Sequence, residues 1–218
     1  MENQKSTGIQ ISNKPNEQIA VVGGGIKILA SGKPILANFT RDWGHIYLLL
    51  DCSGSMKHKK LDYAKAGIMD FARDAFKKEY QVGLIKFGDN AETLCEPTSD
   101  IAVLQEKLAG MRPGGSTNMT SAIMSAHLKL NSFKGPKVIV IATDGMPDNV
   151  KTSLEAAESA KADGIEMITI GTEDAKVEFL KKLASRSELS AQVSNDKFGQ
   201  AISSASLLLT GPKNTKPI

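Results

Sequence analysis

The stretch HIYLLLD at residues 45–51 is an unbroken apolar run that ends at a single aspartate. A continuous apolar run of this length is typical of a strand that is covered on both faces. QVGLIKF at 81–87, KVIVIATDG at 137–145 and GIEMITIG at 164–171 have the same apolar character. The sequence therefore predicts a sheet whose central strands are buried between two layers.

Segments with helical periodicity separate these strands. Residues 59–78 place Leu61, Ala64, Ile68 and Phe71 at helical spacing, which indicates an amphipathic helix. Further helices are expected over 100–109, 118–130, 147–162, 177–183 and 195–209. Apolar strands that alternate with helices favour parallel strands joined by right-handed crossovers. We therefore predict an α/β fold: an open, doubly wound, mostly parallel sheet with helices on both faces and one short antiparallel edge strand.

The segment ETLCEP at 92–97 is the candidate for that antiparallel edge strand. Residues 1–17 and 210–218 are polar and contain prolines, so we expect them to be disordered tails. Residues 18–44 look like two or three extended pieces separated by glycine-rich turns, and a β-hairpin at a sheet edge is one arrangement they could take. One domain over 45–209 accounts for the rest of the chain.

The composition excludes several classes of protein. The 218 residues include 27 Lys and Arg against 24 Asp and Glu, a net charge of +3, which is too balanced for an obligate nucleic-acid binder or a polybasic membrane tether. Two cysteines exclude a disulfide-dense scaffold and a zinc module of the CxxC type. No apolar run is long enough to span a membrane, and the first residues lack the apolar stretch of a signal peptide. We therefore expect a cytoplasmic protein that is monomeric on its own and makes no membrane contact.

Three polar loops are the candidates for a functional site. DCSGS at 51–55 follows the first buried strand, GGSTN at 114–118 precedes a helix, and TDG at 143–145 ends the third buried strand. In sheets of this type, ligands bind outside the carboxyl ends of the strands, where the strand order reverses. The loops offer two carboxylates and several hydroxyls but no imidazole. Such hard oxygen ligands suit Mg²⁺ or Mn²⁺ and argue against zinc or copper.

The pattern Asp51-x-Ser53-x-Ser55 is similar to the D-x-S-x-S motif of the von Willebrand factor A (vWA) domain. Thr117 and Asp144 stand where that family carries the rest of its metal-ion-dependent adhesion site (MIDAS). The resemblance implies that Ser53 and Ser55 bind the metal through their hydroxyls. Thr117 would bind it directly in the ligand-competent state and through water otherwise. Asp51 and Asp144 would mostly orient waters and hydroxyls, with Asp144 able to replace Thr117.

The resemblance also implies a function. A metal ion held mainly by neutral hydroxyls and water keeps much of its positive charge, so its open position favours an anionic oxygen from outside. That oxygen would come from an Asp or Glu side chain of a partner protein, which makes the chain a magnesium-dependent interaction module and not an enzyme. Lys57, His58, Lys59 and Lys60 follow the metal loop, and they are expected either to steer an acidic partner or to form an ordinary solvated loop.

Three other functions fit parts of the sequence. Intracellular vWA proteins serve as subunits beside AAA+ ATPases, so this chain could be a metal-independent scaffold in a chelatase-like complex. A metal-assisted phosphohydrolase is a weaker hypothesis, because the sequence offers no general base besides Asp51 and Asp144. RNA binding would depend on the cationic residues 57–60 alone, and the nearly neutral net charge weighs against it.

Overall fold

Strand β4 (Gly44–Asp51) lies in the interior of a six-stranded sheet, with β5 (Tyr80–Phe87) parallel on one side and β7 (Lys137–Thr143) parallel on the other. Successive side chains of a strand point to opposite faces of the sheet. Leu48 and Leu50 therefore pack in one apolar cluster, and Tyr47 and Leu49 pack in the other. All four side chains are fully buried, as the unbroken apolar run predicts.

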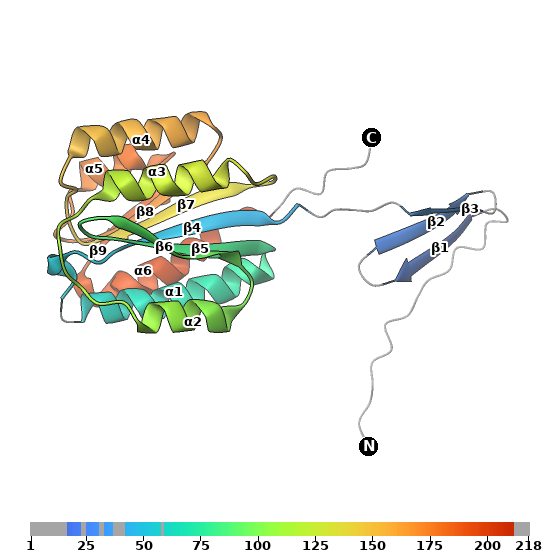
Figure 1. Cartoon of the computed structure of the whole chain (residues 1–218), viewed down its shortest axis with the longest axis horizontal. Helices are drawn as coiled ribbons and strands as arrows, with labels where there is room; N and C mark the ends of the chain where they lie inside the picture. The colour runs from blue at the N-terminus through green and yellow to red at the C-terminus, as the bar shows by residue number, and fades with distance from the viewer. Residues whose placement is uncertain (1–16, 23–24, 31–32, 37–41, 58, 212–218) are drawn as a thin grey trace, which may run out of the picture. The chain divides into compact units, whose positions relative to one another are not determined.

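The computed structural model describes residues 17–22, 25–30, 33–36, 42–57 and 59–211. The chain divides into two units, Met1–Arg41 and Asp42–Ile218. The larger unit holds the six-stranded sheet and the smaller one holds a sheet of three strands (Figure 1). Most of the two expected tails, 1–16 and 212–218, lies outside the described residues.

The six-stranded sheet has the order β6-β5-β4-β7-β8-β9. Every neighbouring pair is parallel except β5 and β6, which are antiparallel. The other strands of this sheet are β5 (Tyr80–Phe87), β6 (Ala91–Thr98), β7 (Lys137–Thr143), β8 (Glu166–Thr172) and β9 (Ser190–Val193). The mostly parallel sheet with one antiparallel edge strand is therefore confirmed.

Helices cover both faces of this sheet, with α1, α2 and α6 on one face and α3, α4 and α5 on the other (Figure 1). Their bounds are α1 Lys60–Lys77, α2 Ile101–Ala109, α3 Met119–Leu130, α4 Val150–Ala162, α5 Val177–Leu183 and α6 Phe198–Ser204. Within the described ranges, no helix combines the length and the apolar character that crossing a membrane requires.

Two details of the C-terminal part differ from the expectation. Strand β9 was not expected, because its short sequence SAQV contains no apolar run and two of its residues are exposed at the sheet edge. The single helix expected over 195–209 is instead α6 flanked by two 3₁₀ turns, Asn195–Lys197 and Ala205–Leu208. The Lys78 ammonium donates to the backbone oxygens of Ser206 and Leu209, which satisfies carbonyl groups at this broken end.

The N-terminal strands β1 (Glu17–Val22), β2 (Gly25–Ala30) and β3 (Lys33–Leu36) pair antiparallel with one another. The sequence predicted two or three extended pieces here, and the structure has three strands. They form a three-stranded sheet of their own.

The Tyr47 side chain carries a hydroxyl group into the apolar cluster between the sheet and α3. Its hydroxyl donates a hydrogen bond to Glu96, and the Lys129 ammonium also donates to that carboxylate. Burial, together with the bond to Glu96, raises the pKa of the Tyr47 hydroxyl. The hydroxyl is therefore protonated and acts as a donor at neutral pH.

Tyr47→Phe is expected to lower the free energy of unfolding by about 1 kcal/mol, because one hydrogen bond is lost while the ring packing stays. Urea denaturation followed by circular dichroism measures this change. Tyr63→Phe is the matched control, because among the described residues the Tyr63 hydroxyl makes no hydrogen bond. Equal stability of Tyr47→Phe and the wild-type protein would contradict the prediction.

Candidate functional site

The strand order reverses between β4 and β7. The chain passes from β4 to β5 on one side and later returns to β7 on the other side. Asp51 is the last residue of β4, and Asp144 directly follows the last residue of β7. Because the two strands are parallel neighbours, their carboxyl ends meet at one edge of the sheet. The topology therefore brings together two carboxylates that are far apart in the sequence, at the place where such sheets bind ligands.

Asp51 is fully buried and held by two donors. The Ser53 amide donates to Oδ1 at 2.8 Å and the Thr143 hydroxyl donates to Oδ2 at 2.6 Å. Burial raises the pKa of the Asp51 carboxyl, although the hydrogen bonds from Ser53 and Thr143 oppose that change. The two hydrogen bonds thus fix the orientation of the carboxylate, and burial disfavours its negative charge.

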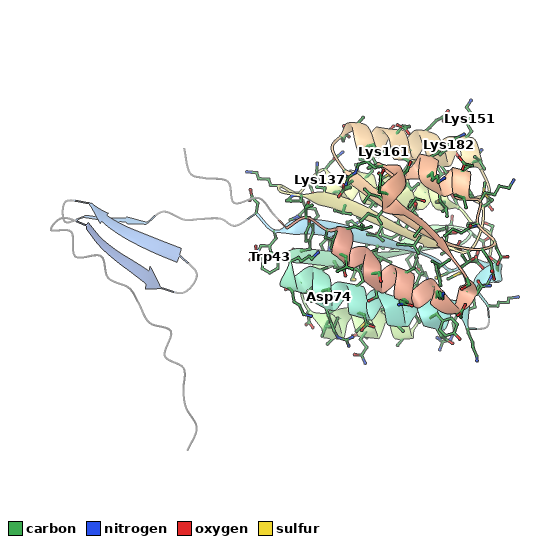
Figure 2. All side chains as sticks on the ribbon, turned by 180° about the vertical axis from the view of Figure 1, so that it is seen from behind. Trp43, Asp74, Lys137, Lys151, Lys161 and Lys182 are labelled. Atoms are coloured by element: carbon green, nitrogen blue, oxygen red, sulfur yellow. The ribbon has the colours of Figure 1, made fainter. Side chains whose placement is uncertain are left out.

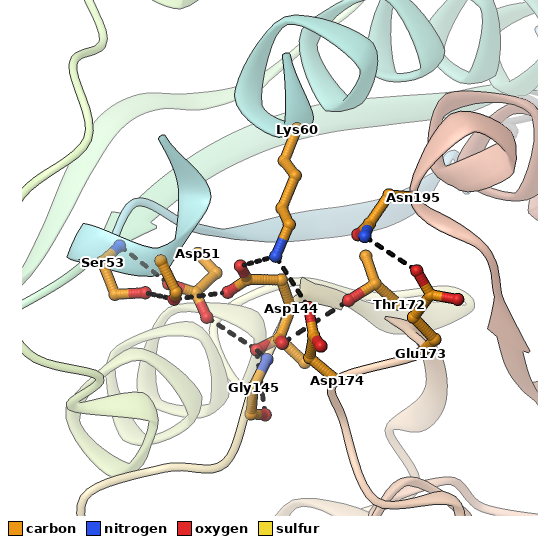
Figure 3. A network of polar contacts seen from close by, with 11 residues as sticks. Asp51, Ser53, Lys60, Asp144, Gly145, Thr172, Glu173, Asp174 and Asn195 are labelled. Carbon is orange, nitrogen blue, oxygen red and sulfur yellow. Dashed lines mark hydrogen bonds and ion pairs between the residues drawn. The ribbon is translucent and has the colours of Figure 1, made fainter. Parts of the chain in front are cut away.

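A continuous row of side-chain oxygens leads from Ser53 to Asp144 (Figure 3). The two serine hydroxyl oxygens, Ser53 Oγ and Ser55 Oγ, lie 2.9 Å apart, and Ser55 Oγ donates to Asp144 Oδ1 at 2.7 Å. A 3₁₀ turn, Gly54–Met56, places both serines on this side of the loop, and the fully buried Met56 anchors the turn in the core. The structure therefore brings together four of the five residues expected at the site.

Thr117, the fifth, lies in a loop that the backbone holds against the serine loop. The Gly114 amide donates to the Cys52 carbonyl at 2.7 Å, and the Gly54 amide donates to the Gly115 carbonyl at 3.0 Å. Among the described residues, the Thr117 hydroxyl makes no hydrogen bond to the other four. Thr117 is thus next to the site through its loop, without a direct side-chain contact.

Two exposed aspartates position the Thr117 loop and were not expected from the sequence. Asp89 accepts a hydrogen bond from the Ser116 amide at 2.8 Å, and Asp148 accepts one from the Thr117 amide at 3.0 Å. Gly115 has a φ of +82°, and a Cβ there would lie 2.7 Å from Asp89 Oδ2. Glycine is therefore required at this point of the loop.

Lys60, expected on the cationic rim, instead points into the site. Its ammonium donates to Asp144 Oδ2 and to Asp174 Oδ2, both at 2.8 Å (Figure 3). Burial by itself would lower the pKa of Lys60, but the two carboxylates outweigh burial and raise it. Asp174 was also missed, although it comes two residues after β8 at the same edge of the sheet. Inspection of the residues after every strand would have included it.

The donor set at this edge matches a hard divalent cation. Its atoms are carboxylate and hydroxyl oxygens from Asp51, Ser53, Ser55 and Asp144, which are the ligands that Mg²⁺ and Mn²⁺ prefer. The Cys52 side chain packs in the core, and burial raises the pKa of its thiol to about 12, so it offers no thiolate. In the described part of the chain, no three or more His, Cys, Asp and Glu side chains are grouped so that they could hold a metal ion by themselves, so a metal at this edge would need the serine hydroxyls as well as the two carboxylates.

The sequence model of the family called von Willebrand factor type A domain matches residues 45–206 of this chain. These residues include the six-stranded sheet, its helices and all five site residues. The chain belongs to the vWA domain family. Domains of this family are protein-interaction modules, and many of them bind a metal ion at the MIDAS.

Two curated proteins are similar to part of this chain. Thrombospondin-related anonymous protein of Plasmodium falciparum is 28% identical over 58% of this chain and 25% of its own length. The magnesium-chelatase 67 kDa subunit of Heliobacterium mobile is 30% identical over 46% of this chain and 16% of its own length. This chain therefore spans a quarter or less of these two relatives.

One similar solved structure, proximal thread matrix protein 1 from the mussel byssus, has zinc in its MIDAS motif. Its identity to this chain is 20%, and the match covers 77% of this chain and 46% of that one with a TM-score of 0.68. This similarity shows the shared vWA fold.

Proposed function

We propose that this vWA domain is a divalent-metal-dependent protein-interaction module. In this proposal Mg²⁺ or Mn²⁺ is held by the MIDAS residues Asp51, Ser53, Ser55, Thr117 and Asp144. The bound metal supplies a Lewis-acidic position that accepts an Asp or Glu side chain of a partner protein. The row of hydrogen-bonded oxygens from Ser53 to Asp144, beside the buried Asp51, is the observation that carries the proposal.

The charges at this edge support metal dependence. Asp51 and Asp144 are buried, and Asp89, Asp148 and Asp174 add exposed carboxylates near them. A partner carboxylate would be repelled by this group of negative charges, because like charges at short range oppose association. In this proposal a divalent cation adds two positive charges at the point where the partner carboxylate would bind, so an acidic partner binds after the metal does.

The exposed rim contributes a smaller attraction. Lys57 and Lys59 are exposed beside the serine loop and can speed the approach of an acidic partner. His58, expected on the same rim, lies outside the described residues. Lys60 is engaged by Asp144 and Asp174, so it does not belong to the steering surface.

We propose that the chain is not an enzyme. We also propose that it is cytoplasmic and that the isolated chain is monomeric. A second candidate function is that of a subunit beside an AAA+ ATPase, working without a metal. The similarity to magnesium-chelatase 67 kDa subunits favours it. The two candidates differ in one measurable property, which is whether chelation of divalent ions abolishes partner binding.

Phage display tests the proposed function. A random peptide library is selected on the immobilised full chain in 5 mM MgCl₂, and bound phage are eluted with EDTA. We expect the EDTA-eluted peptides to share an Asp or Glu, and replacement of that residue by Asn or Gln to reduce binding about tenfold or more. The Ser55→Ala variant, which lacks one hydroxyl of the site, should not enrich them. Enrichment of peptides without a carboxylate, or binding that survives EDTA, would contradict the proposal.

A further inference from the structure

Lys60 has an unusual place for a cation. It is the first residue of α1, and a positive charge at the N-terminal end of a helix is opposed by the helix dipole. Its ammonium nevertheless reaches Asp144, which lies in the loop after β7 and has a completely buried side chain. The two carboxylates that accept its hydrogen bonds therefore determine its position, and the helix dipole does not.

The Asp144 carboxylate has both of its oxygens in use. Oδ1 accepts from the Ser55 hydroxyl and Oδ2 accepts from the Lys60 ammonium. Lys60 is thus the counter-ion of a carboxylate that belongs to the proposed metal site. Asp174, whose side chain is 57% exposed, shares the same ammonium from the solvent side.

We propose that Lys60 is an internal cation that competes with the divalent metal for Asp144 and thereby weakens metal binding, with Asp174 drawing the ammonium away. This inference rests on the proposed metal site. When a metal ion binds beside Ser55 and Asp144, the positive charge of Lys60 lies close to it and opposes its binding. Asp174 offers the ammonium a second partner, which reduces this opposition.

The proposal predicts effects of opposite sign for the two partners. Lys60→Met keeps an unbranched apolar stem of nearly the same length but removes the charged ammonium, and it should tighten metal binding about tenfold. Asp174→Asn leaves Asp144 as the sole carboxylate partner of Lys60, and it should weaken metal binding several-fold. A purely structural role of the Lys60 bridge predicts that both substitutions change binding in the same direction.

Titration of the full chain with Mn²⁺, with free Mn²⁺ followed by electron paramagnetic resonance, measures the affinity directly. Lys77→Met is the matched control, because Lys77 ends the helix that Lys60 begins, about 25 Å away. It pairs with Asp74, on α1 in Figure 2, and its removal changes the net charge by the same amount. Lys60→Gln is a second uncharged variant, and thermal unfolding in EDTA verifies that each variant is folded.

Tighter Mn²⁺ binding by Lys60→Met and Lys60→Gln, weaker binding by Asp174→Asn and no change for Lys77→Met would support the proposal. Equal or weaker binding by both uncharged Lys60 variants would overturn it and leave the proposed metal site intact. Binding by the Lys60 variants but not by the wild-type chain would support competition and overturn metal dependence of the natural protein. Absence of Mn²⁺ binding in every variant would overturn both proposals.

Discussion

Replacement of Asp51 by Asn is expected to abolish the stabilisation of the protein by Mg²⁺. At a Mg²⁺ concentration about 100 times the Kd, the wild-type chain should gain about 2.7 kcal/mol in the free energy of unfolding. For a chain of this size the Tm would rise by several degrees. Asn keeps the size of the side chain and can accept from the Ser53 amide, but it lacks the negative charge that a hard divalent ion requires.

The state of the metal-free variant distinguishes lost binding from lost folding. Because burial raises the pKa of Asp51, removal of its charge should not destabilise the chain in EDTA. Differential scanning calorimetry in EDTA and in MgCl₂ measures both quantities. Asp74→Asn removes an exposed aspartate from α1 and should retain the full response to Mg²⁺. An unchanged response of Asp51→Asn would mean that Asp51 is not part of a metal site.

Replacement of Gly67 by Ala is expected to destabilise the larger unit by about 3 kcal/mol. Gly67 lies on α1 where this helix packs against α6, and a Cβ there would lie 2.2 Å from the backbone oxygen of Gly199. The obstacle is backbone, so no rotamer change can relieve it. Ala is the better helix former by about 1 kcal/mol, so a net loss must come from the forced separation of the two helices.

Urea denaturation measures the loss, with Gly114→Ala as the control. A Cβ at Gly114 would meet nothing within 4 Å, and that change should leave the free energy of unfolding within about 0.5 kcal/mol of the wild-type value. Gly199→Ala is the reciprocal test, because its Cβ would lie 2.4 Å from the Tyr63 carbonyl oxygen and should cause a similar loss. A neutral effect of Gly67→Ala would show that α1 and α6 do not approach this closely in solution.

The sheet could be predicted from the sequence because its central strands are buried on both faces. Burial of both faces leaves a continuous apolar run, as in β4, and that signal does not depend on the neighbours of the strand. β9 was missed because an edge strand needs no such run. The break of the last helix was missed for a related reason. The apolar spacing continues through residues 205–209, while the chain there forms a 3₁₀ turn whose carbonyls bind Lys78.

The site was predictable in part. The carboxyl ends of parallel neighbours share one edge, so the loops that carry Asp51, Ser53, Ser55 and Asp144 had to meet. Thr143 was not expected to bind Asp51, because a hydroxyl at the end of a strand gives no sign in the sequence of the carboxylate it will reach. The place of Thr117 beside the serine loop depends on backbone hydrogen bonds, and these leave no residue pattern either.

The sequence alone determined the order of the buried strands and of the helices between them, the sheet edge at which the polar loops gather, and the all-oxygen chemistry of those loops, because these follow from local apolar patterns and residue types. Only the tertiary structure decided that Lys60 turns inward to Asp144 while its neighbours Lys57 and Lys59 stay exposed. Four cationic or titratable residues in a row look equivalent in the sequence. The packing of α1 against the sheet places its first residue close to the loops after β7 and β8, and there the Lys60 ammonium reaches the buried Asp144 carboxylate.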